Sequence, residues 1–291
     1  MSTESLATPD KMSHVLADVI AHGGRVQSVS KIELPLATTG PFISVVSEGA
    51  QVTVVLGNDD TPWTDPLAHV QPARLYTKKS PAFDGIGKVY LGREISEVMG
   101  HLGAGWLERP EREQEERTDL LVELMDVEPD EVIADIGSGT GYFSLRLARQ
   151  VPKGKVIAVD IQPEMNEILE ENARQEGIEN VETVLGEIDD TKIPANTIDV
   201  VLFVDAYHEF SHPWEMKRSL MKAMRPGGRI VLVEYRAEDP TVRIKPRHKM
   251  TEAQARREFE AAGFQWVRTF DDLPQQHVLI FRKPDPQTAG D

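Results

Sequence analysis

The sequence predicts an α/β fold with a doubly wound, seven-stranded, mostly parallel sheet whose last strand is antiparallel, preceded by a small N-terminal α+β region. Two observations predict this class. From about residue 131, short apolar runs alternate with helical patterns, which is typical of right-handed βαβ crossovers. The last two runs are separated only by residues 271–274, too few for a crossover helix, so we expect them to pair as an antiparallel hairpin.

The first 88 residues form a distinct N-terminal region in this interpretation. Residues 8–22 are expected to form a helix, because Thr8 and Pro9 suit its start and an apolar stripe runs along one face. The runs 43–46 and 51–56 flank a Ser-Glu-Gly-Ala turn and predict a hairpin. Residues 57–88 are rich in Pro, Asp and Gly and are expected to be a linker. We expect residues 1–88 to act as a cap or dimerisation element, and the apolar stripe favours a homodimer.

The larger domain is expected to span residues 89–284, with a disordered tail over 285–291. Two helices, near 94–102 and over 111–125, should open it. Continuous apolar runs are typical of parallel strands covered on both faces. The predicted strands are 131–136, 155–159, 181–185, 198–204, 229–234, 266–270 and 277–281.

Composition excludes several classes of protein. The 291 residues include 32 Lys and Arg against 48 Asp and Glu, and the resulting charge of −16 disfavours a nucleic-acid partner. The absence of cysteine excludes disulfides, thiolate metal sites and a cysteine nucleophile. No apolar run approaches the roughly 20 residues that span a bilayer, and the N-terminus lacks the pattern of a secretory signal. We therefore expect a cytoplasmic protein without a membrane partner.

A glycine-rich turn follows the first strand of the larger domain. Residues 132–143 read VIADIGSGTGYF, a strand that runs into three glycines and then a helix. Glycines let the backbone turn sharply and approach a ligand closely, and the helix N-terminus offers free N–H groups. A dinucleotide-binding turn needs its third glycine at the sixth position, where this chain has Tyr142. The spacing therefore disfavours a nicotinamide dinucleotide.

Acidic residues follow the next two strands. Asp160 ends the second strand, where a carboxylate can accept both hydroxyls of an adenosine ribose. Glu187 and Ile188 follow the third strand, where an acidic side chain and a backbone N–H can contact an adenine edge. The C-terminal ends of neighbouring parallel strands form the crevice in which open α/β sheets bind ligands. An adenosine-containing cofactor is the predicted ligand.

With these motifs the chain resembles the class I S-adenosylmethionine-dependent methyltransferase superfamily, including uncharacterised bacterial members. The resemblance covers about residues 132–283 and rests on ADIGSGTGYF, VIAVDIQPEM, GEIDD, TIDVVLFVDAYHEF, MRPGGRIVLVEYR and LPQQHVLIFRK. It implies S-adenosyl-L-methionine as cofactor and methyl transfer as activity. The superfamily often has Asp where Glu187 stands. The resemblance would place Asp135, Gly137, Ser138, Gly139 and Gly141 at the aminocarboxypropyl end, Asp160 at the ribose, Glu187 and Ile188 at the adenine, and Asp205 at the methionine portion, with Ile161 as a further cofactor-binding residue.

Residues 204–210, VDAYHEF, follow the fourth strand and are expected beside the transferred methyl group. His208 can act as a base or only position the acceptor, with Glu209 or Asp205 orienting its ring. Tyr207 can line the site and contact the sulfonium through its ring. The alternative is that His208 and Glu209 only cap or pair at the start of the next helix.

Further candidates for acceptor binding follow the fifth strand. Tyr235 and Arg236 should emerge at the ligand-bearing edge, where Arg236 can bind an anionic acceptor or pair with a neighbouring glutamate. His248 lies in the following loop and can belong to an acceptor lid. No metal site is expected, because the Asp-Asn pair of divalent-metal catechol-type enzymes is absent after the fifth strand.

The sequence therefore favours a methyltransferase that acts on the O, N or C atom of a small molecule. The alternatives are a protein methyltransferase that docks through its N-terminal region, a non-catalytic protein that binds the cofactor, and a nicotinamide oxidoreductase. The last is disfavoured by Tyr142 and by the antiparallel last strand.

Overall fold

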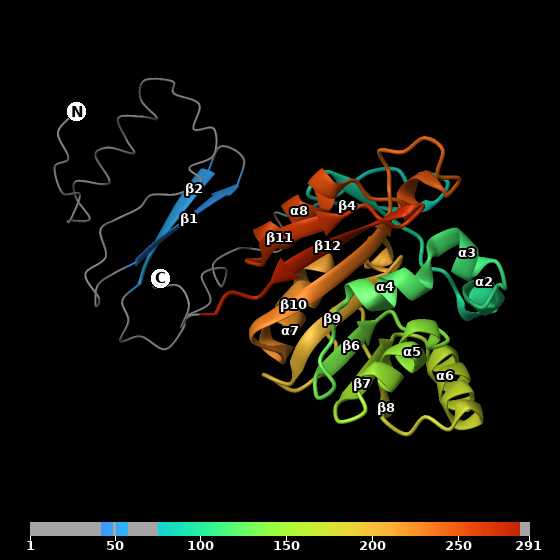
Figure 1. Ribbon diagram of the computed structural model, residues 1–291. Helices are drawn as coiled ribbons and strands as arrows, with labels where there is room; N and C mark the ends of the chain where they lie inside the picture. The colour runs from blue at the N-terminus through green and yellow to red at the C-terminus, as the bar shows by residue number, and fades with distance from the viewer. Residues whose placement is uncertain (1–41, 49–50, 58–74, 286–291) are drawn as a thin grey trace, which may run out of the picture. The chain divides into compact units, whose positions relative to one another are not determined.

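The computed structural model describes residues 42–48, 51–57 and 75–285 (Figure 1). The chain divides into two compact units, Met1–Thr64 and Asp65–Asp291. In the first unit, β1 (Phe42–Glu48) and β2 (Gln51–Gly57) pair in antiparallel register, which confirms the predicted hairpin. The helix predicted over residues 8–22, most of the predicted linker and nearly all of the tail lie outside the described residues.

The second unit is built on one seven-stranded sheet, in the order β11-β12-β10-β9-β6-β7-β8. β6 to β10 pair in parallel, and β12 runs antiparallel to both β10 and β11. The predicted fold class is confirmed. The strands are β6 (Val132–Ile136), β7 (Lys155–Asp160), β8 (Val181–Leu185), β9 (Ile198–Val204), β10 (Met224–Tyr235), β11 (Gln265–Phe270) and β12 (Gln276–Arg282).

Both faces of the sheet are covered, as its continuous apolar strands require. Successive side chains of a strand point to opposite faces. Leu202 of β9 belongs to a core cluster with Leu121 and Phe143, whereas Phe203 meets Phe259 on the other face, with 6.2 Å between ring centroids. Among the described residues, no helix is long and apolar enough to cross a membrane. The main helices are α5 (Tyr142–Gln150), α6 (Pro163–Glu176), α7 (Pro213–Ala223) and α8 (Glu252–Ala261).

A three-stranded antiparallel sheet precedes the main sheet in the chain. It consists of β3 (Tyr76–Lys78), β4 (Gly85–Tyr90) and β5 (Arg93–Ser96). The domain boundary expected after residue 88 falls inside this sheet. The helix predicted near residues 94–102 is wrong over most of its length, because β5 pairs with β4, the Glu94 carboxylate accepts the backbone N–H groups of Ala82 and Gly87, and helical structure begins only at His101.

Short helices connect this small sheet to β6. They are η2 (His101–Gly103), α2 (Ala104–Leu107), α3 (Arg112–Glu116) and α4 (Thr118–Leu124). The single helix predicted over 111–125 is broken between α3 and α4, because Arg117 adopts a left-handed conformation with φ of 53°. The break lets the two short helices take different directions.

A buried charge network joins the small sheet to the main core. Arg93 donates to both oxygens of Glu258 in α8, at 2.7 and 3.0 Å. The Tyr207 hydroxyl also donates to Glu258, at 2.7 Å, and accepts from the Lys217 ammonium. Burial lowers the pKa of Lys217 to about 7, whereas Arg93 outweighs the effect of burial and holds the pKa of Glu258 below its usual range. Glu258 is therefore the counter-charge of two buried cations.

We predict that Glu258→Gln destabilises the folded chain by about 3 to 5 kcal/mol, because two cations would remain buried without their shared counter-charge. Urea-induced unfolding, followed by circular dichroism, measures this. The matched control is Glu260→Gln, exposed on the same helix, which should change the free energy of unfolding by less than about 0.5 kcal/mol. A loss no larger than that of the control would contradict the role of Glu258.

Candidate active site

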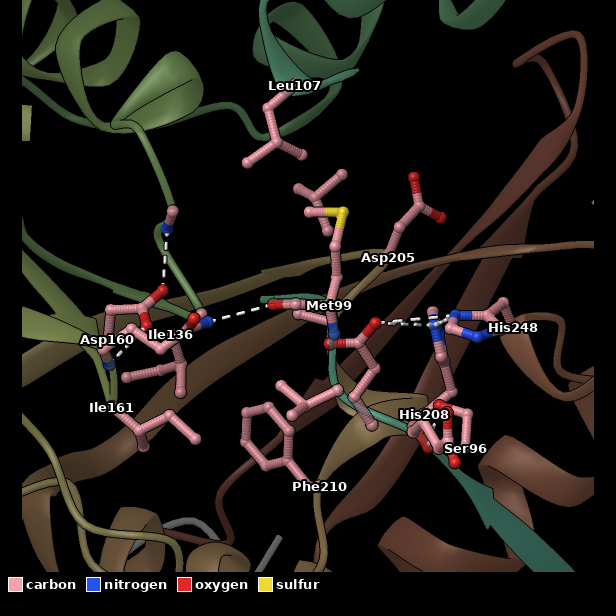
Figure 2. Close-up of a pocket in the computed structure, with 18 of the residues that line it drawn as sticks. Ser96, Met99, Leu107, Ile136, Asp160, Ile161, Asp205, His208, Phe210 and His248 are labelled. Carbon is pink, nitrogen blue, oxygen red and sulfur yellow. Dashed lines mark hydrogen bonds and ion pairs between the residues drawn. The ribbon is translucent and has the colours of Figure 1, made fainter. Parts of the chain in front are cut away.

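A cavity of about 610 Å³ lies at the C-terminal ends of β6, β7, β9 and β10. Its volume is in the range of about 300 to 1,000 Å³ that is typical of small-molecule sites. The strand order reverses between β6 and β9, and open α/β sheets bind ligands at such a point. Figure 2 shows Asp160 and Ile161 at one end of the cavity and His208 and His248 at the other. We call these ends the cofactor side and the histidine side.

The glycine turn leaves room on the cofactor side. Gly137 and Gly139 line the cavity with φ angles of 79° and 54°. A Cβ atom on Gly137 would lie 2.7 Å from the Cβ of Ala206, and one on Gly139 would lie 2.7 Å from Leu107. Any side chain at these positions would therefore collide with the walls of the site.

The other two residues predicted in this turn lie behind the cavity wall. Gly141 has φ of 87°, and a Cβ there would come 2.6 Å from Leu169 of α6, so this glycine permits helix packing. Ser138 is buried, and its hydroxyl has no hydrogen-bond partner within the described part of the chain. Neither lines the cavity.

Asp160 is held at the end of β7 by backbone donors. Its carboxylate accepts the N–H of Gly139 at 3.0 Å and that of Gln162 at 2.9 Å, and burial raises its pKa. Ile161, Glu187 and Ile188 also line this side, as predicted from strand order. The Glu187 carboxylate is exposed and pairs with Lys192 at 2.9 Å.

Two further acids lie at the ends of β6 and β9, and their hydrogen-bond partners differ. Asp135 does not line the cavity, because its carboxyl accepts from the Ser144 hydroxyl of α5 at 2.6 Å. Burial raises its pKa to about 6. Asp205 does line the cavity: one carboxyl oxygen accepts from Gln276 at 3.1 Å, and the other is buried with no partner in the described part of the chain. That oxygen is available to a ligand donor.

A polar cluster beside Asp205 contains the predicted Tyr235 together with Glu116 and Arg112, which sequence reasoning missed. The carboxylate of Glu116 in α3 accepts from the hydroxyl of Tyr235 at 2.9 Å and from Arg112 at 3.0 Å. All three side chains are buried and line the cavity. The Arg112–Glu116 pair has the local i,i+4 spacing of a helix, but its place in the cavity could not be predicted from spacing, because the contact with Tyr235 joins residues 119 positions apart.

His208 lies on the histidine side in η3 (Tyr207–Glu209), and its orienting carboxylate is Glu234 rather than Glu209 or Asp205. Glu234 Oε2 is 2.6 Å from the ring Nδ1, and Oε1 accepts the His208 backbone N–H at 3.1 Å. Figure 2 shows Asp205 pointing away from the ring. Burial raises the pKa of Glu234 to about 8 and lowers that of His208 to about 3. The signal for Glu234 was present, since it is the one carboxyl inside the apolar run VLVEY.

Two residues predicted near the methyl acceptor also do not reach the cavity. Tyr207 is fully buried, 4.8 Å from the Phe259 ring, because the tight turn of η3 points it towards α8 while His208 faces the cavity. Arg236 donates to the backbone carbonyls of Asp271 and Leu273, in the connection between β11 and β12. The prediction that Tyr207 lines the site is therefore wrong, and Arg236 lies outside the cavity.

The loop before α8 completes the histidine side. His248, in η4 (Pro246–His248), places its Nδ1 3.2 Å from Nε2 of His208 and 3.5 Å from a carboxylate oxygen of Glu209. Arg243 and Lys245 of the same loop are exposed and line the opening. These two cations occupy the place expected for Arg236.

Comparisons with known proteins agree with this geometry. A family model for a methyltransferase domain matches residues 128–272. The ubiquinone/menaquinone biosynthesis C-methyltransferase UbiE of Ectopseudomonas mendocina is 29% identical over 118 residues, 40% of this chain and 46% of the relative. The solved structure of an S-adenosylmethionine-dependent methyltransferase from Aquifex aeolicus superposes with a TM-score of 0.61 at 22% identity, over 64% of this chain and 99% of that one. The chain belongs to the class I S-adenosylmethionine-dependent methyltransferases.

The uncharacterized methyltransferase YcgJ of Bacillus subtilis is 25% identical over 168 residues, 57% of this chain and 66% of the relative. The chain thus spans less than two thirds of the length of these curated relatives. The methyl donor of the class is S-adenosylmethionine, and the residues that line the cavity fit it. Gly137 and Gly139 leave the backbone beside the cavity without side chains, and the Asp160 carboxylate lines the same side. Asp205 has an unpartnered oxygen that suits an ammonium group.

We predict that Asp135 makes this methyltransferase less stable as the pH rises from about 4 to 6. Its folded pKa of about 6 exceeds its ordinary value, so the folded state holds the proton more tightly. The resulting stabilisation is fully present below about pH 4 and lost above about pH 6. Relative to Asp135→Asn, the wild type should lose up to about 3 kcal/mol across this window.

Urea unfolding at several pH values between about 4 and 7 measures the difference between the two proteins. Asp130→Asn, an exposed position before the same strand, is the control and should reproduce the wild-type profile. Parallel profiles for wild type and Asp135→Asn would refute the prediction.

Proposed function

We propose that the chain transfers the methyl group of S-adenosylmethionine to a small-molecule acceptor, at an oxygen, nitrogen or carbon atom. The observation that supports this is one continuous cavity that contains both Asp160 and His208. The cofactor side has the acids that suit an adenosine and an ammonium group. The histidine side adds polar groups that an adenosyl cofactor does not need.

Different residues along the cavity would bind different parts of the cofactor. Asp160 would accept the two ribose hydroxyls, Ile161 and Ile188 would contact the adenine, and the free oxygen of Asp205 would accept from the ammonium group. The bound cofactor supplies an electrophilic methyl group on a sulfonium. Phe210 and Met99 project into the middle of the cavity (Figure 2) and would exclude water from the path of transfer. Alignment of acceptor and methyl group can account for most of the rate.

Apolar side chains in the walls of the cavity favour an acceptor with an apolar body. Ile86, Val98 and Trp106 line the cavity while 39 to 52% exposed, and covering such surface contributes about 25 cal/mol per Å². Arg243 and Lys245 at the opening suit a polar or anionic end. The similarity to a C-methyltransferase of quinone biosynthesis is consistent with an apolar ring as acceptor.

We predict micromolar binding of S-adenosylmethionine and S-adenosylhomocysteine, and no binding of NADH, in calorimetric titrations. Asp160→Ala should weaken both sulfur ligands at least tenfold, since two hydrogen bonds to a charged group are lost. Asp189→Ala, an exposed acid outside the cavity, is the matched control and should bind like the wild type.

Circular dichroism should first show that Asp160→Ala is folded, because this carboxylate also accepts from the glycine turn. Binding of NADH without either sulfur ligand would overturn the proposed function. Once the donor is established, turnover is measured as release of S-adenosylhomocysteine with quinol, phenol and amine acceptors.

A further inference from the structure

Two histidines and a carboxylate converge on the histidine side of the cavity. Nε2 of His208 lies 3.2 Å from Nδ1 of His248 and 3.9 Å from Oε1 of Glu209, and the last two atoms are 3.5 Å apart. The side chains of Glu209 and His248 are 14% and 18% exposed, and that of His208 is buried. Figure 2 shows His208 and His248 side by side.

The spacing of these three atoms is that of ligands around a metal ion. The point in their common plane that is equidistant from the three atoms lies about 2.1 Å from each. This is the length of a Zn–N or Zn–O bond. Both distances to Glu209 are too long for good hydrogen bonds, so an ion pair alone leaves the carboxylate oxygen poorly satisfied. We propose that His208, Glu209 and His248 bind one divalent first-row transition metal ion of the zinc type.

The groups behind these ligands are arranged as in metal sites. A metal-bound histidine usually donates its second ring N–H to a carboxylate, and Glu234 stands 2.6 Å from Nδ1 of His208. The second oxygen of Glu209 accepts the backbone N–H of Met99 at 3.1 Å, which fixes that carboxylate.

The backbone of His208 is also fixed. Its carbonyl accepts from Arg93 at 2.9 Å and from the Ser96 hydroxyl at 3.2 Å. Both donors belong to β5, so the small sheet holds the ligand-bearing turn from behind. A site built this way needs little rearrangement to receive an ion.

The ligand types select the class of metal. Two imidazoles and one carboxylate suit zinc, iron, cobalt and nickel, whereas magnesium and calcium prefer oxygen ligands. Three protein ligands leave a coordination position open, as in catalytic zinc sites. All three residues line the cavity, so water or an acceptor oxygen can reach that position. Only the acceptor's use of this position rests on the proposed function, and metal binding itself does not.

The test uses the full chain, stripped of metal by a chelator and free of S-adenosylmethionine. We expect elemental mass spectrometry to find one Zn²⁺ per chain after dialysis against Zn²⁺. The affinity for Zn²⁺ should be micromolar or tighter. Co²⁺ titrated into the stripped protein should give visible ligand-field absorption that Zn²⁺ abolishes, and an excess of Mg²⁺ should leave it unchanged.

Single substitutions test which residues bind the metal ion. His248→Ala and Glu209→Gln should each lower the Zn²⁺ affinity at least tenfold, and Glu234→Gln should lower it about 10- to 100-fold by loss of the supporting carboxylate. His101→Ala is the matched control, because this histidine also lies beside a carboxylate, 3.8 Å from Glu164, but outside the cavity. It should bind Zn²⁺ like the wild type.

Either of two results would overturn the proposal. One is the absence of stoichiometric Zn²⁺ and of a Co²⁺ spectrum in the stripped wild type. The other is undiminished binding in the double variant Glu209→Gln, His248→Ala, shown to be folded by thermal unfolding. Calorimetry with S-adenosylmethionine on the same samples keeps the two proposals apart, because loss of metal binding with retained cofactor binding refutes only the metal site.

Discussion

Four carboxyl groups lie at one edge of the seven-stranded sheet, at the ends of β6, β7, β9 and β10, and the site follows from how each is compensated. A buried charge or polar group without a partner is costly, so the chain must supply a donor to each. The carboxyl of Asp135 accepts a hydrogen bond from a hydroxyl of α5, and that of Asp160 accepts one from a backbone N–H of the glycine turn. The carboxyl of Glu234 is hydrogen-bonded to the ring and to the backbone N–H of His208. Asp205 keeps one oxygen unpartnered within the described part of the chain. Asp135, Asp160 and Glu234 therefore have hydrogen-bond partners within the chain, whereas one oxygen of Asp205 is left for a ligand.

The segment before the methyltransferase domain is part of this arrangement. The Arg93 guanidinium pairs with Glu258 in α8 and also donates to the carbonyl of His208. One side chain thus connects the stability of the core with the position of the histidine. Shifting α8 relative to β5 would move the turn that carries His208 and Glu209, so the small sheet belongs to the site although it precedes the domain that the family model matches.

The periodicity of the sequence was sufficient for the sheet and for the cofactor side. β6, β7 and β9 are mostly apolar runs, and parallel strands bring their C-terminal ends to the same edge of the sheet. Asp160, Glu187 and Ile188, which strand order had placed together, line the cavity beside Gly137.

The histidine side depends on contacts that local patterns do not encode. Within the three residues of η3, Tyr207 turns to the core and His208 to the cavity, a choice made by the packing of Phe259 and by Glu234 on a different strand. Arg236 satisfies loop carbonyls that exist only once β11 and β12 have paired. Forty positions separate His208 from His248, so their approach follows from the tertiary fold and not from spacing.

The two ends of the cavity also constrain each other electrostatically. The cofactor would carry a positive sulfonium, and the metal ion proposed for the histidine side would keep a net charge of about +1 beside the Glu209 carboxylate, so the two would repel each other. An acceptor that carries negative charge on its reactive oxygen would be attracted by both, whereas a neutral amine would reduce the repulsion far less. Arg243 and Lys245 at the opening favour the same class of acceptor on a chain whose net charge is −16. If both the proposed metal ion and the proposed cofactor bind, the charges of this cavity would favour an acceptor that reacts through an anionic oxygen.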